Sequence, residues 1–234
     1  MNIIFTRPLL ESEDLMTSFF SSGHKVIHVP TLSIKSASMK SIHTEDYDAF
    51  IFTSANAVRY LNLKNEDKKI KCFCVGNFTE RSLRLKGFNN TVAASGTVNA
   101  LKNIIINSEK KMKKFAYLCG DVISYDLDKE LIKEGFNVNK IINYISSKIL
   151  VLNNETMDLI KKHPPNITFI YSKRSAESFC EIVRKYSLSE LMTRCTVMCI
   201  SKKIEDFLKS KGWNKTAIFN PGEELLKIDR IKNG

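Results

Sequence analysis

The sequence lacks the features that define several large classes of protein. No apolar stretch approaches the roughly 18 residues of a membrane-spanning helix, and residues 1–5 have the pattern of a strand and not of a secretory signal. The six cysteines include no Cys-x-x-Cys pair, and the four histidines are not spaced as metal ligands. We therefore expect a cytoplasmic protein with reduced thiols and without a metal site.

Motifs for nucleotide binding and for nucleophilic catalysis are missing as well. Thr6, Arg7 and Pro8 follow the first expected strand, where a dinucleotide-binding protein has its glycine-rich turn, and there is no Walker motif. The sequence has no Gly-x-Ser-x-Gly motif and no evident cysteine–histidine pair. An enzyme with this sequence would depend more on positioning a reactive substrate than on acid–base side chains, and we expect no cofactor.

The chain of 234 residues carries a net charge of +11, with 43% hydrophobic and 26% charged residues. This length allows one large domain or two small ones. Its basic residues are spread along the chain, with one cluster that we place in a surface loop, at Lys110, Lys111, Lys113 and Lys114. A solvated surface explains such a charge, and a polyanionic small molecule or a nucleic acid are the alternatives.

Short apolar runs alternate with amphipathic stretches along almost the whole chain, which is typical of βα units. The expected strands are residues 2–5, 25–29, 49–53, 71–75, 115–119, 167–171, 196–200 and 216–219. Several helices between them end at a glycine, as at Gly87, Gly135 and Gly212. The pattern predicts an α/β fold with doubly wound parallel sheets.

Residues 50–57 and 169–176 resemble each other, and each segment is followed by a second matching run, at 72–76 and 197–201. Two copies of a βαβα unit favour two similarly folded domains, although any two such stretches share some likeness.

Two extended segments, near residues 30–38 and 139–150, interrupt the alternation of strands and helices. Paired with each other, they would form a two-stranded β connector. We then expect a discontinuous α/β domain of residues 1–32 and 149–234 and an inserted α/β domain of residues 36–145, with the ligand in a cleft between them.

Small polar residues or glycines follow almost every expected strand. In an open parallel sheet these turns line the carboxyl edge, where helix N-termini attract anions. The candidate binding residues in the turns are Arg7, Thr53, Ser54, Gly76, Thr79, Gly96, Thr97, Gly120, Ser172 and Ser201. Helix capping alone explains the residue type at any single turn, but the number of turns favours a receptor for several carboxylates or phosphates.

Tyr144, in the second extended segment, carries a phenol hydroxyl. A tyrosine on a strand is most simply a packing residue. A phenol, with a pKa of about 10, is also neutral at physiological pH and able to donate a proton to a leaving oxygen. Tyr144 is therefore the candidate catalytic residue.

The order of these motifs resembles that of the uroporphyrinogen-III synthase family, in its bacterial form, over nearly the whole chain. The matching positions are residues 6–8 with Leu15, Gly23 and Pro30, residues 52–58, 75–79, 96–97 with Leu101, 119–121, Tyr144, 171–176 and 199–201. Residues 52–58, with the sequence FTSANAV, are the most recognisable of them.

The resemblance implies a two-domain enzyme that converts hydroxymethylbilane, a substrate with eight carboxylates, into uroporphyrinogen III. The family's reaction removes the terminal hydroxyl, inverts the last pyrrole through a spiro intermediate and closes the ring without metal or cofactor. Tyr144 matches the family's tyrosine implicated in loss of that hydroxyl. Asn56, a further candidate binding residue, stands where other members have arginine, and Lys202 and Lys203 stand where many have threonines.

Two alternatives remain open at this point. A non-catalytic two-domain binder of an anionic metabolite would use the same turns, and the charge alone motivates a nucleic-acid-binding protein. Since no long exposed apolar stripe indicates a protein partner, we expect a monomer that binds a small-molecule substrate and neither nucleic acid nor membrane.

Overall fold

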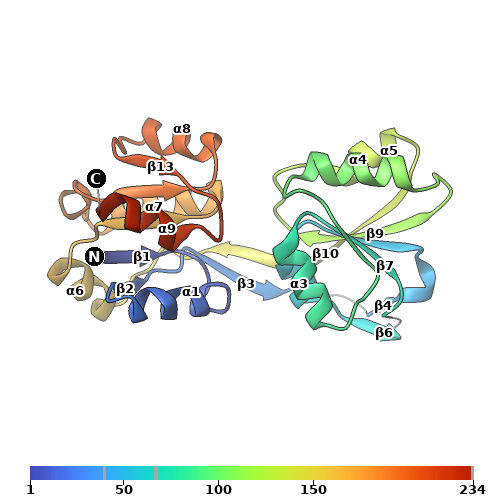
Figure 1. Cartoon of the computed structure of the whole chain (residues 1–234), viewed down its shortest axis with the longest axis horizontal. Helices are drawn as coiled ribbons and strands as arrows, with labels where there is room; N and C mark the ends of the chain where they lie inside the picture. The colour runs from blue at the N-terminus through green and yellow to red at the C-terminus, as the bar shows by residue number, and fades with distance from the viewer. Residues whose placement is uncertain (39–40, 66–67, 233–234) are drawn as a thin grey trace. The chain divides into compact units, whose positions relative to one another are not determined.

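The computed structural model describes residues 1–38, 41–65 and 68–232 (Figure 1). The chain divides into two compact units: unit 1 comprises Met1–Ser33 and Ser147–Gly234, and unit 2 comprises Ile34–Ser146. Within the described ranges, no helix is long and apolar enough to cross a membrane.

Unit 1 is built on a sheet of five parallel strands in the order β13-β12-β11-β1-β2. The strands are β1 (Asn2–Phe5), β2 (Lys25–His28), β11 (Ile167–Ile170), β12 (Thr196–Cys199) and β13 (Thr216–Ile218). The central strand β1 pairs with β11 in the register Ile3 to Ile167. This pairing of the start of the chain with its last third makes unit 1 discontinuous.

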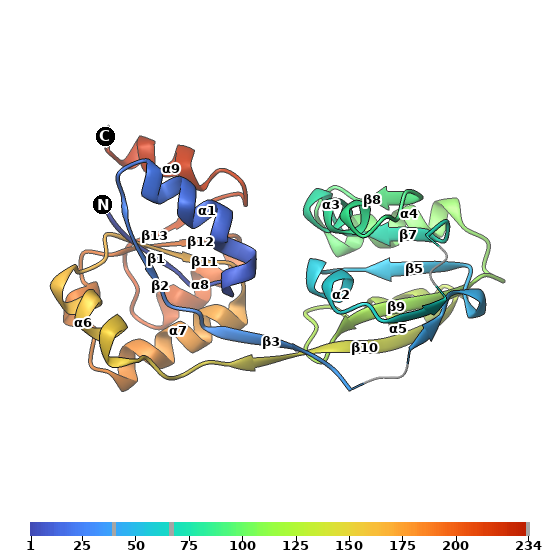
Figure 2. The same cartoon turned by 90° about the horizontal axis from the view of Figure 1, so that it is seen from below.

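Helices cover both faces of this sheet; Figure 2 shows α1 and α9 on one face and α7 on the other. The helices are α1 (Leu9–Ser21), α6 (Asn154–Lys162), α7 (Lys173–Lys185), α8 (Lys202–Ser210) and α9 (Glu224–Lys232), with a short 3-10 helix at Glu190–Met192. Phe5 packs with Phe19 of α1, and the adjacent Ile4 packs in a second core with Phe179 of α7. Successive residues of a strand point to opposite faces of the sheet. A strand with a core on each face is therefore apolar at consecutive positions.

Unit 2 contains a six-stranded sheet in the order β3-β10-β9-β5-β7-β8. The strands are β3 (Leu32–Ser36), β5 (Ala49–Phe52), β7 (Lys71–Cys74), β8 (Thr91–Ala93), β9 (Lys114–Gly120) and β10 (Asn137–Lys148). All pairs from β10 to β8 are parallel. At the edge, the extended segments that contain β3 and β10 are hydrogen-bonded neighbours, and the Ala37 N–H donates to the Asn143 carbonyl at 3.1 Å.

The sheet of unit 2 is also covered on both faces. Its helices are α2 (Ala55–Arg59), α3 (Asn77–Leu85), α4 (Val98–Ser108) and α5 (Leu127–Lys133), with a 3-10 helix at Thr44–Asp46. Phe50 packs with Leu83 of α3, whereas its neighbour Ile51 packs with Leu101 of α4 and Leu131 of α5. The doubly wound α/β fold expected from the alternating pattern is therefore confirmed in both units.

The two sheets share one spatial order of strands, although the chain runs through them differently. In that order, β5, β7 and β8 correspond to β11, β12 and β13, and β9 and β10 correspond to β1 and β2. The similar segments 50–57 and 169–176 thus fall on equivalent βα units, β5–α2 and β11–α7.

The structure corrects the expectations in two places. The short strands β8, β4 (Ile42–His43) and β6 (Leu63–Asn65) were not predicted, because two or three residues show no clear periodicity. The lysine cluster is not simply a loop: Lys114 begins β9, and Lys113 pairs with the buried carboxylate of Glu109 at 2.6 Å. Burial would raise the pKa of Glu109, but hydrogen bonds from Lys113 and Lys71 outweigh it and lower the pKa.

Candidate functional site

The predicted binding residues follow the carboxyl ends of parallel strands in each unit. Those of unit 1 come after β1, β11 and β12, namely Arg7, Ser172 and Ser201. Those of unit 2 come after β5, β7, β8 and β9, namely Thr53, Ser54, Asn56, Gly76, Thr79, Gly96, Thr97 and Gly120, which ends β9. Because the strands of a sheet are parallel, each set gathers at one edge of its own sheet.

The strand order singles out some of these residues. It reverses between β1 and β11 in unit 1 and between β5 and β9 in unit 2. At such switch points the neighbouring connections leave on opposite faces, and α/β proteins bind ligands beside the strand ends there. Arg7 and Ser172 flank the first switch point, and Thr53, Ser54 and Gly120 flank the second.

Three of the predicted hydroxyls are helix caps. Ser54 of α2, Thr97 of α4 and Ser172 of α7 accept first-turn N–H groups at 3.2, 3.1 and 3.0 Å, respectively. Within the described chain, Ser201 makes no such bond at the start of α8, and Gly76 brings no side chain to the start of α3. The first-turn amides of α3 and α8 are therefore not capped by these side chains, a state that favours an anion.

This difference between caps predicts a difference in stability. Ser172→Ala should lower the free energy of unfolding by about 1 kcal/mol, because it removes the cap of α7. Ser201→Ala should change it little, because the Ser201 hydroxyl caps nothing in α8. Urea denaturation of both variants measures this. Equal losses would show that the cap of α7 does not set the stability at this turn.

The turns after β7 and β8 touch each other. A Cβ placed on Gly76 would lie 3.4 Å from the Cα of Gly96, and Gly96 itself has a φ of +93°, which glycine adopts without strain. Thr79 of α3 is only 4% exposed, so its side chain is buried. The backbone N–H of Thr79 lies in the first turn of α3, at the carboxyl edge of the sheet.

Tyr144 of β10 lies across the end of β9. It pairs in register with Gly120, and a Cβ on Gly120 would lie 2.6 Å from both Cε2 and Cζ of the tyrosine ring and 2.9 Å from its oxygen. The backbone here is tied by the Asp121 N–H, which donates to the Tyr144 carbonyl at 3.1 Å. A glycine at position 120 is therefore what allows the ring to lie beside the switch point of unit 2.

Two polar residues near this edge were not predicted. Tyr117 of β9 has its hydroxyl 3.0 Å from the Thr53 hydroxyl, and burial raises its pKa far above the ordinary value, so it stays neutral. Asp128 of α5 is 7% exposed, and its Oδ1 has no hydrogen-bond partner among the described residues. Neither residue belongs to a recognisable motif, so only the packing of β9 and α5 reveals them.

A guanidinium that no sequence motif indicated also lies at the turn after β5. Asn56 accepts a hydrogen bond on Oδ1 from Nη1 of Arg59 at 3.0 Å. Asn56 stands where the resemblance leads one to expect arginine. Arg59, three residues further along α2, brings a guanidinium back to the same turn.

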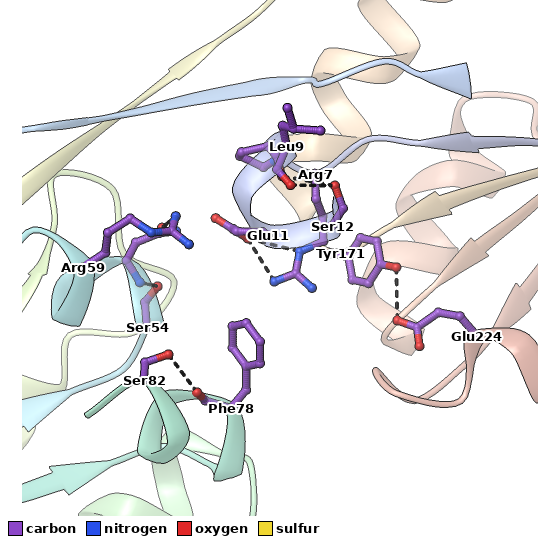
Figure 3. A network of polar contacts seen from close by, with 12 residues as sticks. Arg7, Leu9, Glu11, Ser12, Ser54, Arg59, Phe78, Ser82, Tyr171 and Glu224 are labelled. Atoms are coloured by element: carbon purple, nitrogen blue, oxygen red, sulfur yellow. Dashed lines mark hydrogen bonds and ion pairs between the residues drawn. The ribbon is translucent and has the colours of Figure 1, made fainter. Parts of the chain in front are cut away.

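In unit 1, Arg7 lies within a group of polar and aromatic side chains (Figure 3). Its Nη2 and Nε donate to the same oxygen of Glu11, at 2.9 and 3.1 Å, and its guanidinium carbon lies 4.6 Å from the ring centroid of Tyr171. The Tyr171 hydroxyl donates to Glu224 at 3.1 Å. Burial, together with the charge of Glu224, raises the pKa of Tyr171, so the phenol stays protonated.

A cavity of about 900 Å³ in unit 1 lies away from all of these residues. Its lining includes Cys195 and Lys215, which directly precede β12 and β13 and so mark the amino edge of the sheet. Arg184 and Lys211, also in the lining, stand at the C-terminal ends of α7 and α8, where the helix dipole stabilises cations. The described residues also contain no cluster of three or more potential metal ligands.

Comparisons with known proteins agree with one another. A family model described as "Uroporphyrinogen-III synthase HemD" matches residues 13–219. Among solved structures, the chain is similar to the uroporphyrinogen-III synthetase of Helicobacter pylori, with a TM-score of 0.67, 19% identity, and coverage of 100% of this chain and 99% of that one. A search of curated proteins gives no significant match.

A mutant uroporphyrinogen III synthase from Thermus thermophilus is a second similar structure, with a TM-score of 0.59, 14% identity and full coverage of both chains. At such identities the two structures support the fold, and the family model, which matches well over half of the chain, supports the family. The chain therefore belongs to the uroporphyrinogen-III synthase family of cyclising lyases, which convert hydroxymethylbilane to uroporphyrinogen III in tetrapyrrole biosynthesis.

Proposed function

We propose that the turns at the carboxyl edges of both sheets bind the carboxylates of hydroxymethylbilane, and that Tyr144 assists loss of the terminal hydroxyl. The observation that carries this proposal is the placement of the Tyr144 ring across Gly120, beside the switch point of unit 2. A phenol there donates its proton to the terminal hydroxyl of the substrate. The C–O bond then breaks, and the hydroxyl leaves as water.

Several weak contacts suit a substrate with many carboxylates. The first turns of α3 and α8, which Gly76 and Ser201 do not cap with a side chain, and the guanidinium of Arg7 offer donors for anions. The net charge of +11 adds a long-range attraction for a polyanion. Because the binding is shared among many groups, loss of Ser172 or Thr79 alone should reduce activity less than loss of Tyr144.

The enzyme's main task is to direct the ring closure. Hydroxymethylbilane also closes unaided, without inversion of the last pyrrole, so the enzyme has to favour one of two products. A hundredfold preference requires a difference in barrier of about 2.7 kcal/mol, which orientation of the bound substrate supplies without a strong acid or base. We propose that this reaction requires neither metal nor cofactor.

Unit 1 and unit 2 are, in this proposal, the two domains expected from the sequence, linked through the segments of β3 and β10. We further propose that the protein works as a cytoplasmic monomer without a nucleic-acid partner. Some of its lysines pair with carboxylates, as Lys148 does with Glu181 at 2.7 Å. Tight, salt-sensitive binding in a gel-shift titration would contradict the last point.

The decisive test is to supply hydroxymethylbilane and to separate the isomers of the product. We expect the type III isomer well above the spontaneous background. A product that is entirely the uninverted isomer would contradict catalysis and support the alternative, a non-catalytic binder of an anionic metabolite.

A further inference from the structure

Glu224, the first residue of α9, is a buried carboxylate with two fixed partners. It is 3% exposed. One oxygen accepts the Tyr171 hydroxyl at 3.1 Å, and the other accepts the Gly222 N–H at 2.7 Å. A buried carboxylate is costly unless such bonds satisfy it, so the start of α9 and the end of β11 are held together.

These bonds give the ring of Tyr171 one orientation. Its hydroxyl is held by Glu224, and its face is set by Phe219, with ring centroids 5.4 Å apart and planes at 88°. The guanidinium carbon of Arg7 lies 4.6 Å from the centroid of this fixed ring. Arginine stacks on aromatic rings in this way with a gain that increases as water is excluded.

The guanidinium of Arg7 is thus held on two sides, by the Tyr171 ring and by the carboxylate of Glu11. Glu11 accepts two of the five N–H groups of a guanidinium, through Nε and Nη2. This arrangement lies at the switch point between β1 and β11. It fixes a flexible side chain before any ligand arrives, which reduces the freedom lost on binding.

We propose that Tyr171, itself held by Glu224, is a positioning residue that orients Arg7 toward a carboxylate of the substrate. The proposal rests on the proposed role of Arg7 in substrate binding and adds a part played by the C-terminal helix. Because a carboxylate is bound equally before and during ring closure, the loss should appear in KM and not in kcat.

The test is a double-mutant cycle with Arg7→Ala, Tyr171→Leu and the double variant, assayed for KM and kcat with hydroxymethylbilane. We expect each single variant to raise KM about tenfold with kcat nearly unchanged. The double variant should be no worse than Arg7→Ala, because Tyr171 acts only through Arg7. Circular dichroism and urea denaturation establish that each variant is folded.

A matched control is Tyr186→Leu. Tyr186 follows α7 at the other end of the helix, and its hydroxyl accepts the Leu152 N–H at 3.1 Å. This variant should lose stability and keep the wild-type KM. An equal rise in KM would show that general loosening of unit 1, and not the orientation of Arg7, is responsible.

Each other outcome is also decisive. An unchanged KM in Arg7→Ala would contradict the proposed role of Arg7 itself. A raised KM in Arg7→Ala with a fully additive effect of Tyr171→Leu would overturn only the positioning role. If Tyr171→Leu does not fold, Tyr171→Phe replaces it: the ring then loses Glu224, and we expect KM to rise about threefold in wild-type but not in Arg7→Ala background. An unchanged KM in Tyr171→Phe would show that Glu224 has no part in positioning Arg7.

Discussion

Replacing Tyr144 by phenylalanine is expected to lower kcat about a hundredfold, a typical effect of removing a positioned proton donor. The free energy of unfolding should change little. The ring, which packs against the core that contains Phe52 and Leu118, stays in place above Gly120 in this variant. What is lost is the hydroxyl that we assign to the departure of the substrate's terminal hydroxyl.

Rates of hydroxymethylbilane consumption, corrected for spontaneous closure, measure this effect. Tyr47→Phe is the matched control. Tyr47 packs against the same core, and its hydroxyl accepts a hydrogen bond from Asn139 at 2.7 Å, but it precedes β5 at the amino edge of the sheet. It should retain the wild-type kcat. Full activity of Tyr144→Phe would return Tyr144 to a packing role.

The second large effect is expected from Gly120→Ala. The new Cβ would lie 2.6 Å from two ring carbons of Tyr144, too close for the ring to remain where it is. We expect a loss of about 1–3 kcal/mol in the free energy of unfolding, the usual cost of overpacking. We also expect a fall in kcat similar to that of Tyr144→Phe, because the displaced hydroxyl no longer meets the leaving oxygen.

Combining Gly120→Ala with Tyr144→Ala separates the two effects. Tyr144→Ala removes the ring and with it the clash. Gly120→Ala should therefore cost less stability in the Tyr144→Ala background than in the wild-type protein, while activity stays low. Gly76→Ala is the comparison for stability: Gly76 is also extended, but its Cβ would lie 3.4 Å from the nearest atom and is tolerated with a small adjustment. Wild-type stability and activity in Gly120→Ala would contradict our account of this contact.

The strands that carry a core on both faces were predictable from their apolar runs. β1 (Asn2–Phe5) has the expected bounds, and β5 and β7 end one residue earlier than expected. The caps were equally predictable as residue types, because Ser54 and Ser172 close a short strand and open a helix within a few residues. Local physics determines both kinds of feature.

The closest contacts of the site depend on register and tertiary packing, which one sequence does not reveal. Nothing local links Gly120 to Tyr144, and their contact exists because β9 and β10 pair in one register. Tyr171 and Glu224 meet because α9 returns to the end of β11. Likewise, the Ser172 side chain caps its helix and the Ser201 side chain does not. This difference depends on side-chain orientation and not on residue type.

The discontinuity of unit 1 has a consequence for the order in which the protein forms during synthesis. All of unit 2, from Ile34 to Ser146, is made without interruption, so its six-stranded sheet lacks only Leu32 and Ser33 of β3 and Ser147 and Lys148 of β10. β1, by contrast, is synthesised first, and its partner β11 follows much later in the chain. The Asn2 N–H, for example, donates to Oδ1 of Asn166, 164 residues away. Until β11 is made, β1 has an open edge, which is where a nascent chain is prone to wrong pairing.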